Sequence, residues 1–258
     1  MIMDLPRKGR LKQETLARRQ AIVAEMERER GSRVITLIHR REPWNESGDD
    51  EHITIEDSEF VLMKIRQTPP EKPVDLIVHT PGGLALAAEM IGMALKHHLA
   101  RVTVMVPFYA MSGGTLIALA ADEIHIEPYS VLGPVDPQIG GMPAISLLRV
   151  SQSKPQETLQ DQTLVLADMA RLALENVRRF VMWLLDGRVP QEQASGIAEF
   201  LSGGYLAHDT PVTLSILREL GLNGVEGLPP KVYDLFETCE FGVCKRPRLA
   251  SYDRELRV

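Results

Sequence analysis

Short apolar runs alternate with amphipathic segments along the first half of the chain. Runs rich in aliphatic residues occupy residues 34–39, 74–79, 102–106 and 123–126, which is the length of buried strands. Segments with helical periodicity lie before or between them, at residues 9–30, 55–65, 84–98 and 112–121. Strands that alternate with helices through short loops predict a right-handed arrangement around a mainly parallel sheet. The pattern therefore predicts an α/β fold.

The pattern changes after residue 133. A loop containing glycine and proline is followed by one long helical pattern at residues 159–185 and a shorter one at residues 212–220. We expect flanking helices around the sheet and a helical C-terminal region. The sequence divides into an N-terminal helical extension (1–32), a catalytic domain (33–238) and a C-terminal tail (239–258).

Composition and charge indicate which partners to expect and where the protein is located. A net charge of −6 with a pI near 5.7 gives no broad cationic surface, so we expect no nucleic acid partner. The first residues pass quickly into charged ones, without the apolar region of a secretory signal. No segment approaches the roughly 18 uninterrupted apolar residues of a membrane span. We expect a cytoplasmic protein, which leaves peripheral association with a membrane open.

The residues that usually hold metals or cofactors are sparse. Cys239 and Cys244 are the two cysteines, and no second Cys or His pair completes a zinc site with them, so we interpret them as reduced thiols. No G-x-G-x-x-G motif follows a strand, and no lysine has the context of a pyridoxal-phosphate site. We expect no metal and no cofactor.

Two glycine motifs carry the chemistry. TPGG at residues 80–83 ends one predicted strand, and MSGG at residues 111–114 begins a predicted helix. Ser112 is placed as a nucleophile, with the N–H of Gly113 as one oxyanion donor and that of Gly82 or Gly83 as the other. Taken alone the motifs are weak evidence, because serine is a common helix cap and glycines permit tight turns.

Further motifs occur in a recognisable order. TPGG and AMSGG are followed by LGPVDPQ at residues 132–138 and GYLAHDTP at residues 204–211. Over residues 34–236 the chain resembles the Clp protease/crotonase superfamily, and within it the SDH (serine dehydrogenase proteinase) family, related to signal peptide peptidase A. The resemblance implies a Clp protease/crotonase-like fold and a serine peptidase, ATP-independent as a single chain, that forms an acyl-enzyme on Ser112. It also implies peptide or protein substrates and a homo-oligomer.

The general base is left open between two residues. Clp protease subunits carry a histidine in the loop that matches residues 128–143, and this chain has none there. The signal-peptide-peptidase branch uses a lysine instead, and Lys154, 42 positions after Ser112, is our first choice for a Ser-Lys dyad. It would need a lowered pKa to act as a base, and an ordinary solvated lysine is the plain alternative.

His208 is the alternative base, although its neighbour Asp209 also has the pattern of a helix cap. The resemblance implies that Asp136, in the LGPVDPQ loop, is buried near the active site, and its plain expected role is a hydrogen bond that fixes the turn.

Two other functions remain compatible with the motifs. The missing loop histidine motivates a catalytically inactive Clp-fold assembly or scaffold protein. A crotonase-like enzyme acting on a coenzyme A thioester would also use an oxyanion hole of backbone N–H groups, but it gives Ser112 no role. Serine dehydrogenase activity is not predicted.

Overall fold

A five-stranded parallel sheet forms the centre of the protein. The computed structural model describes residues 5–40, 42, 44 and 52–239. The order of the strands is β1-β2-β3-β5-β9, and every neighbouring pair is parallel. Their bounds are β1 (Arg33–Ile38), β2 (Val74–His79), β3 (Val102–Val106), β5 (Glu123–Ile126) and β9 (Gly224–Glu226). The predicted α/β fold with a mainly parallel sheet is confirmed. β9 was not predicted, because it is a three-residue edge strand without a buried apolar run.

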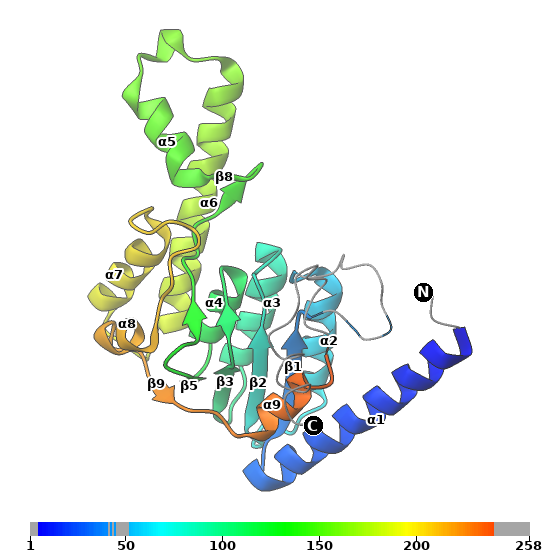
Figure 1. Cartoon of the computed structure of the whole chain (residues 1–258). Coiled ribbons are helices and arrows are strands. Elements are labelled where there is room, and N and C mark those ends of the chain that lie inside the picture. Colours follow the sequence, from blue (N-terminus) through cyan, green and yellow to red (C-terminus); the bar gives the residue numbers. More distant parts are fainter. Residues whose placement is uncertain (1–4, 41, 43, 45–51, 240–258) are drawn as a thin grey trace, which may run out of the picture.

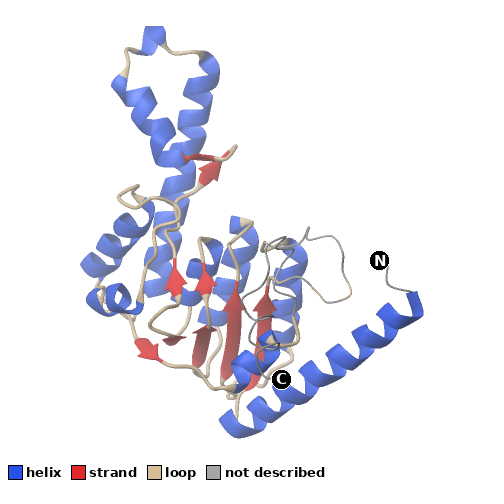
Figure 2. Ribbon diagram, in the orientation of Figure 1, coloured by secondary structure: helices blue, strands red, loops and turns tan. Residues whose placement is uncertain are grey.

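Helices cover both faces of this sheet (Figures 1 and 2). Successive side chains of a strand point to opposite faces, so β2 contributes Leu76 and Val78 to one core and Ile77 to the other. The larger core packs against α2, α3, α4 and the C-terminal half of α6, and the smaller one against α1 and α9. The bounds are α1 (Leu5–Arg30), α2 (Ile55–Arg66), α3 (Ala85–Lys96), α4 (Gly113–Leu119), α6 (Asp161–Leu185) and α9 (Lys231–Phe236).

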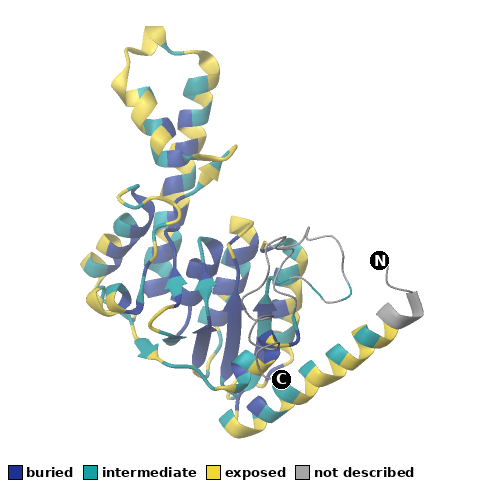
Figure 3. Cartoon of the chain, in the orientation of Figure 1, coloured by how far each residue is buried: buried dark blue, intermediate teal, exposed yellow. Residues whose placement is uncertain are grey.

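The C-terminal half is helical, as expected, and part of it projects from the body. It contains α5 (Ala144–Ser153), the short 3₁₀ helix η1 (Gln156–Thr158), α6, α7 (Gln191–Ser202) and α8 (Leu214–Glu219). α5 and the N-terminal half of α6 form a hairpin that stands away from the sheet, and we call residues 144–174 the arm (Figure 1). Its two helices share a small core of Ala144, Leu147, Ala170 and Leu174. Much of its remaining surface is exposed (Figure 3).

Two short ribbons extend the structure beyond the strand ends. β4 (Tyr109–Ala110) pairs in parallel with β6 (Val131–Leu132), and β7 (Gln138–Ile139) pairs antiparallel with β8 (Met142–Pro143). A single bridge joins Thr80 to Ala110, so the chain after β2 is tied to β4. These ribbons bring both glycine motifs and the LGPVDPQ loop to the carboxyl end of the sheet.

Every helix in the described part of the chain is too short or too polar to cross a lipid bilayer. Within the same residues, no three His, Cys, Asp or Glu side chains gather in a way that suits a metal ion. The thiol of Cys239 is not in a disulfide and accepts a hydrogen bond from Arg19 at 3.3 Å, and burial raises its pKa. Cys244 lies outside the described residues.

His79 at the end of β2 makes stability depend on pH. The ring is buried among Phe108, Tyr109 and Phe236, and burial, with the nearby charge of Arg40, lowers its pKa to about 3. The unfolded chain, where the value is near 6.5, therefore binds a proton more readily than the folded one. The free energy of unfolding should fall as the pH drops from about 6.5 toward about 3.

Denaturant titrations across this pH window test the expectation. His79→Phe keeps an aromatic ring but cannot bind a proton, so its stability should decline less steeply with acid than that of the wild type. His52→Gln, at an exposed histidine, is the control and should keep the wild-type slope. Equal slopes for wild type and His79→Phe would contradict the role assigned to His79.

Candidate active site

Ser112 stands in an unusual backbone conformation at the start of α4. Its φ is 49° and its ψ is −111°, and it is the one non-glycine residue with positive φ in the described part of the chain. Side chains with a Cβ avoid this region, and keeping a residue there costs on the order of 1–3 kcal/mol. Its side chain makes no capping hydrogen bond to the helix. The interpretation of Ser112 as an ordinary helix cap therefore loses its support.

The glycines of both motifs pack closely around this serine. A Cβ placed on Gly82 would lie 2.9 Å from the Cβ of Ser112 and 3.4 Å from the nitrogen of Gly113. On Gly113, a Cβ would lie 3.0 Å from the Cβ of Ala88 and 3.7 Å from the nitrogen of Gly83. The structure thus brings Ser112, Gly82, Gly83 and Gly113 together, with no room for larger residues.

The backbone N–H groups at this site are not equivalent. The N–H of Gly82 donates to Thr80 Oγ1 at 3.1 Å, so it is already engaged. The N–H groups of Gly83 and Gly113 have no acceptor among the described residues. Gly83 itself is held in place by Ile53, whose N–H donates to the Gly82 carbonyl at 2.7 Å and whose carbonyl accepts from the N–H of Leu84 at 2.9 Å. Of the two alternatives left open for the second donor, the hydrogen bonding favours Gly83.

The LGPVDPQ loop is fastened to the same region. The hydroxyl oxygen of Thr115, in α4, lies 2.8 Å from the carbonyl oxygen of Gly133. The same hydroxyl accepts a hydrogen bond from the N–H of Gly133 at 3.0 Å. A Cβ on Gly133 would overlap Met111, the residue before Ser112. The loop that continues from Gly133 to Asp136 therefore starts directly beside the serine.

Asp136 and His208 form a pair at the end of this loop. Asp136 Oδ1 lies 2.7 Å from His208 Nδ1, with the carboxylate 4% exposed and the imidazole 43% exposed. Gln138 donates to the other carboxylate oxygen, Oδ2, at 2.7 Å. The segment with His208 is held to β6 by two reciprocal backbone hydrogen bonds of 2.9 Å between Leu132 and Val212. A buried carboxylate on Nδ1 orients an imidazole and leaves Nε2 toward the exterior.

This pair gives Asp136 more than the turn-fixing role expected from the sequence. Its partner comes from 72 positions further along the chain, and Asp209, the carboxylate next to His208, is not the residue that orients the ring. The Leu132–Val212 bridge between distant segments creates the pair. In the sequence, the pairing of Asp136 with His208 is indicated only when the motifs LGPVDPQ and GYLAHDTP are considered together.

Lys154 lies elsewhere in the single chain. It is exposed and is the C-cap residue that directly follows α5. The C-terminal end of α5 lies in the part of the arm that stands away from the sheet (Figure 1). α5 begins beside Pro137, whose carbonyl accepts from the N–H of Ala144. The ten residues of α5 then carry the chain about 15 Å along the arm. The structure brings His208, but not Lys154, to the loop beside Ser112.

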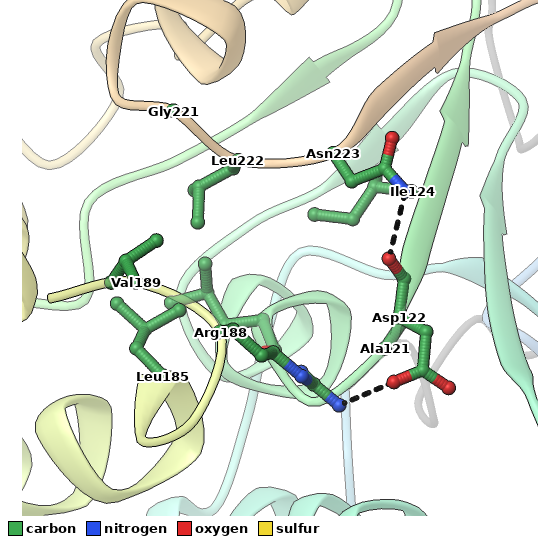
Figure 4. Close-up of a pocket in the computed structure, with 10 residues that line it drawn as sticks. Ala121, Asp122, Ile124, Leu185, Arg188, Val189, Gly221, Leu222 and Asn223 are labelled. Carbon is green, nitrogen blue, oxygen red and sulfur yellow. Dashed lines mark hydrogen bonds and ion pairs between the residues drawn. The ribbon is translucent and has the colours of Figure 1, made fainter.

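A separate cavity of about 230 Å³ lies at the opposite end of α4 (Figure 4). Its wall includes Leu119, Asp122, Arg188 and Leu222. The guanidinium of Arg188 donates to the carbonyls of Leu119 and Ala120, at 2.8 and 2.6 Å, and to Asp122 at 3.1 Å. Arg188 thus satisfies the last carbonyls of α4 and holds the helix that starts at Ser112.

Removal of Arg188 should lower the stability of the fold. Arg188→Ala leaves two carbonyls and Asp122 without this donor, and we expect the free energy of unfolding to fall by roughly 2–3 kcal/mol. The matched control is Arg171→Ala, whose ion pairs with Asp168 and Glu175 are exposed, so this variant should leave the free energy of unfolding nearly unchanged. Denaturant titration measures both, and equal losses would contradict the capping role.

Comparison with known proteins agrees with this architecture. The family described as ClpP-like SDH-type serine proteinase matches residues 2–253 of the chain. The uncharacterized protein MJ1495 of Methanocaldococcus jannaschii is 49% identical over 224 residues, which are 86% of this chain and 76% of the relative. The uncharacterized protein MJ0137 of the same organism is 48% identical over 228 residues, which are 88% of this chain and 79% of the relative. The chain belongs to the family of ClpP-like SDH-type serine proteinases.

Proposed function

We propose that the protein is a serine peptidase that cleaves peptides or proteins through an acyl-enzyme on Ser112. The observation that carries the proposal is the positive φ of Ser112 beside the N–H groups of Gly83 and Gly113. Backbone strain of this kind persists where the surrounding structure enforces it, and it clusters at functional sites. A strained serine next to two unengaged donors matches the needs of acyl transfer, which are an accessible nucleophile and an oxyanion hole.

In the proposed reaction, Ser112 Oγ attacks the scissile carbonyl carbon while His208 Nε2 takes its proton. The oxyanion that forms accepts hydrogen bonds from the N–H groups of Gly83 and Gly113. His208 then passes the proton to the leaving amine, and the carbon–nitrogen bond breaks to leave the acyl-enzyme. Water hydrolyses the ester with the same histidine as base. Asp136 orients the ring and stabilises the imidazolium.

His208 is preferred to Lys154 as the base because of the arm. Within one chain, the hydrogen bond to Asp136 holds His208 at the loop that starts beside Ser112. Lys154 follows the end of α5, which leads away from that loop, so a contact between Lys154 and the serine of the same chain has no support. A Ser-Lys dyad would require Lys154 to reach Ser112 of a second copy in a homo-oligomer. The exposed apolar residues Val165, Met169 and Leu172 of α6 agree with an arm that meets another copy. The dyad is therefore kept as the competing proposal.

A fluorophosphonate probe, which modifies activated serines, gives the first test. The wild-type protein should be labelled at Ser112, and Ser112→Ala should not be labelled. Absence of labelling in the wild-type protein, together with absence of hydrolysis, would favour the inactive scaffold instead.

A further inference from the structure

A buried hydrogen-bonded chain runs behind the two glycine motifs. His39, directly after β1, has a side chain that is 7% exposed. Its Nδ1 lies 2.7 Å from Thr80 Oγ1, and its Nε2 lies 3.2 Å from Asp57 Oδ2 in the first turn of α2. Asp57 is fixed in turn by a capping box with Thr54. The proposed reaction gives these side chains no role, yet they end at the turn that presents the oxyanion donors.

Thr80 connects the two halves of the site. It is fully buried, its N–H donates to the carbonyl of Tyr109 at 3.1 Å, and its carbonyl accepts from the N–H of Met111 at 2.9 Å. These bonds fix the strand that leads into Ser112. Its hydroxyl oxygen accepts from the N–H of Gly82 at 3.1 Å, which fixes the other motif. One residue thus sets the distance between the serine and the Gly82–Gly83 turn.

The donors and acceptors along this chain specify its direction. The carboxylate of Asp57 can only accept, so His39 Nε2 carries the proton and donates to it. With the ring neutral, Nδ1 is the acceptor and takes the hydroxyl proton of Thr80 over the shorter distance, 2.7 Å, while the Gly82 carbonyl lies 3.2 Å from the same hydroxyl. This leaves the lone pairs of Thr80 Oγ1 directed at the N–H of Gly82. The orientation of the hydroxyl therefore depends on His39, and that of His39 depends on Asp57.

We infer that His39 and Thr80 are positioning residues of the oxyanion hole, acting through Gly82 on the N–H of Gly83. The inference rests on the proposed function for its catalytic consequence. Gly82 has a φ of 112° and Gly83 a φ of 156°, so both depend on their surroundings to keep one conformation. If the hydroxyl of Thr80 is removed or turned, the Gly83 N–H no longer points steadily at the oxyanion, while substrate contacts elsewhere persist.

Two matched pairs of variants test this inference. Thr80→Val removes the hydroxyl and keeps nearly the same side-chain shape, whereas Thr80→Ser keeps the hydroxyl. His39→Gln places a side-chain amide near the former position of Nε2, so the hydrogen bond to Thr80 is lost. His39→Asn places a side-chain amide near the former position of Nδ1, so the hydrogen bond to Thr80 is kept. We expect Thr80→Val and His39→Gln to lower kcat roughly 10- to 100-fold with KM unchanged, a part of the loss for a deleted oxyanion donor. Thr80→Ser and His39→Asn should stay within about threefold of the wild type.

An activity-independent readout accompanies the kinetics. In protein labelled with ¹⁵N-glycine, the amide resonances of Gly82 and Gly83 should shift and exchange faster with solvent in Thr80→Val and His39→Gln, and return toward wild type in the other two. If the wild-type protein hydrolyses nothing, the proposed function fails, and the spectra still decide whether the chain of hydrogen bonds orders the turn. Unchanged Gly82 and Gly83 amides in Thr80→Val, or equal effects of His39→Gln and His39→Asn, would overturn the inference.

Discussion

Replacement of Ser112 by alanine is expected to lower peptide hydrolysis roughly 10⁴- to 10⁶-fold, as loss of the nucleophile does in other serine hydrolases. Without the hydroxyl no acyl-enzyme can form, although in the proposed site the N–H groups of Gly83 and Gly113 would still bind the carbonyl oxygen of the substrate. Hydrolysis of a peptide mixture, followed by mass spectrometry of the products, measures the effect. Ser153→Ala, at an exposed serine of the arm, is the control and should retain wild-type activity.

Ser112→Gly separates the loss of activity, which follows from removal of the hydroxyl, from the change in stability, which follows from the backbone conformation at residue 112. Glycine tolerates positive φ, so this variant should gain about 1 kcal/mol in its free energy of unfolding relative to Ser112→Ala, while both remain inactive. A gain in stability with complete loss of activity is the signature of strain kept for function. Equal stabilities of the two variants would show that the conformation at residue 112 costs nothing.

The second large effect is expected at the base. His208→Ala should lower kcat about 10⁴-fold or more, and Asp136→Asn about 10³- to 10⁴-fold, because the imidazole loses its orientation and its charge partner. Lys154→Ala is the matched variant and should stay within about twofold of the wild type. The rate of hydrolysis of a chromogenic peptide measures all three. The opposite ranking, with Lys154→Ala inactive and His208→Ala active, would replace His208 by the Ser-Lys dyad.

Mixed assemblies distinguish the two bases further. If Lys154 acts on the serine of another copy, mixing inactive Lys154→Ala with inactive Ser112→Ala protein should restore part of the activity, because some neighbours would supply each missing group. If His208 acts within one chain, Lys154→Ala is active alone. A mixture of His208→Ala with Ser112→Ala should then remain inactive.

Much of the fold could be predicted from the sequence because strong periodicity marks buried elements. The runs that became β2 and β3 are buried along their whole length, and they were located within one residue. β9 could not be found in this way, because it has three residues at a sheet edge, none of them buried, and they carry no apolar pattern. The separate helix α5 was also missed, because it is a ten-residue helix between a glycine-containing loop and the proline at position 155, and its short apolar face was included in that loop.

Proximity between residues of the candidate site could be predicted from the sequence where they are neighbours in the chain, and not where they are distant in it. Ser112 and Gly113 share one motif, so their proximity was visible. Asp136 and His208 meet only because Leu132 pairs with Val212. The reach of His39 to Thr80 depends on the parallel alignment of β1 with β2, in which Ile38 lies opposite His79. No local pattern contains such a register.

The most direct test of the account is a pre-steady-state measurement with a nitrophenyl ester, followed by mass spectrometry of the trapped protein. The account predicts a burst of nitrophenolate with an amplitude near one per chain in the wild-type protein, and an acyl group on the peptide that contains Ser112. Ser112→Ala should give neither. A burst that persists in Ser112→Ala, or an acyl group on a residue other than Ser112, would contradict the claim that this serine is the nucleophile.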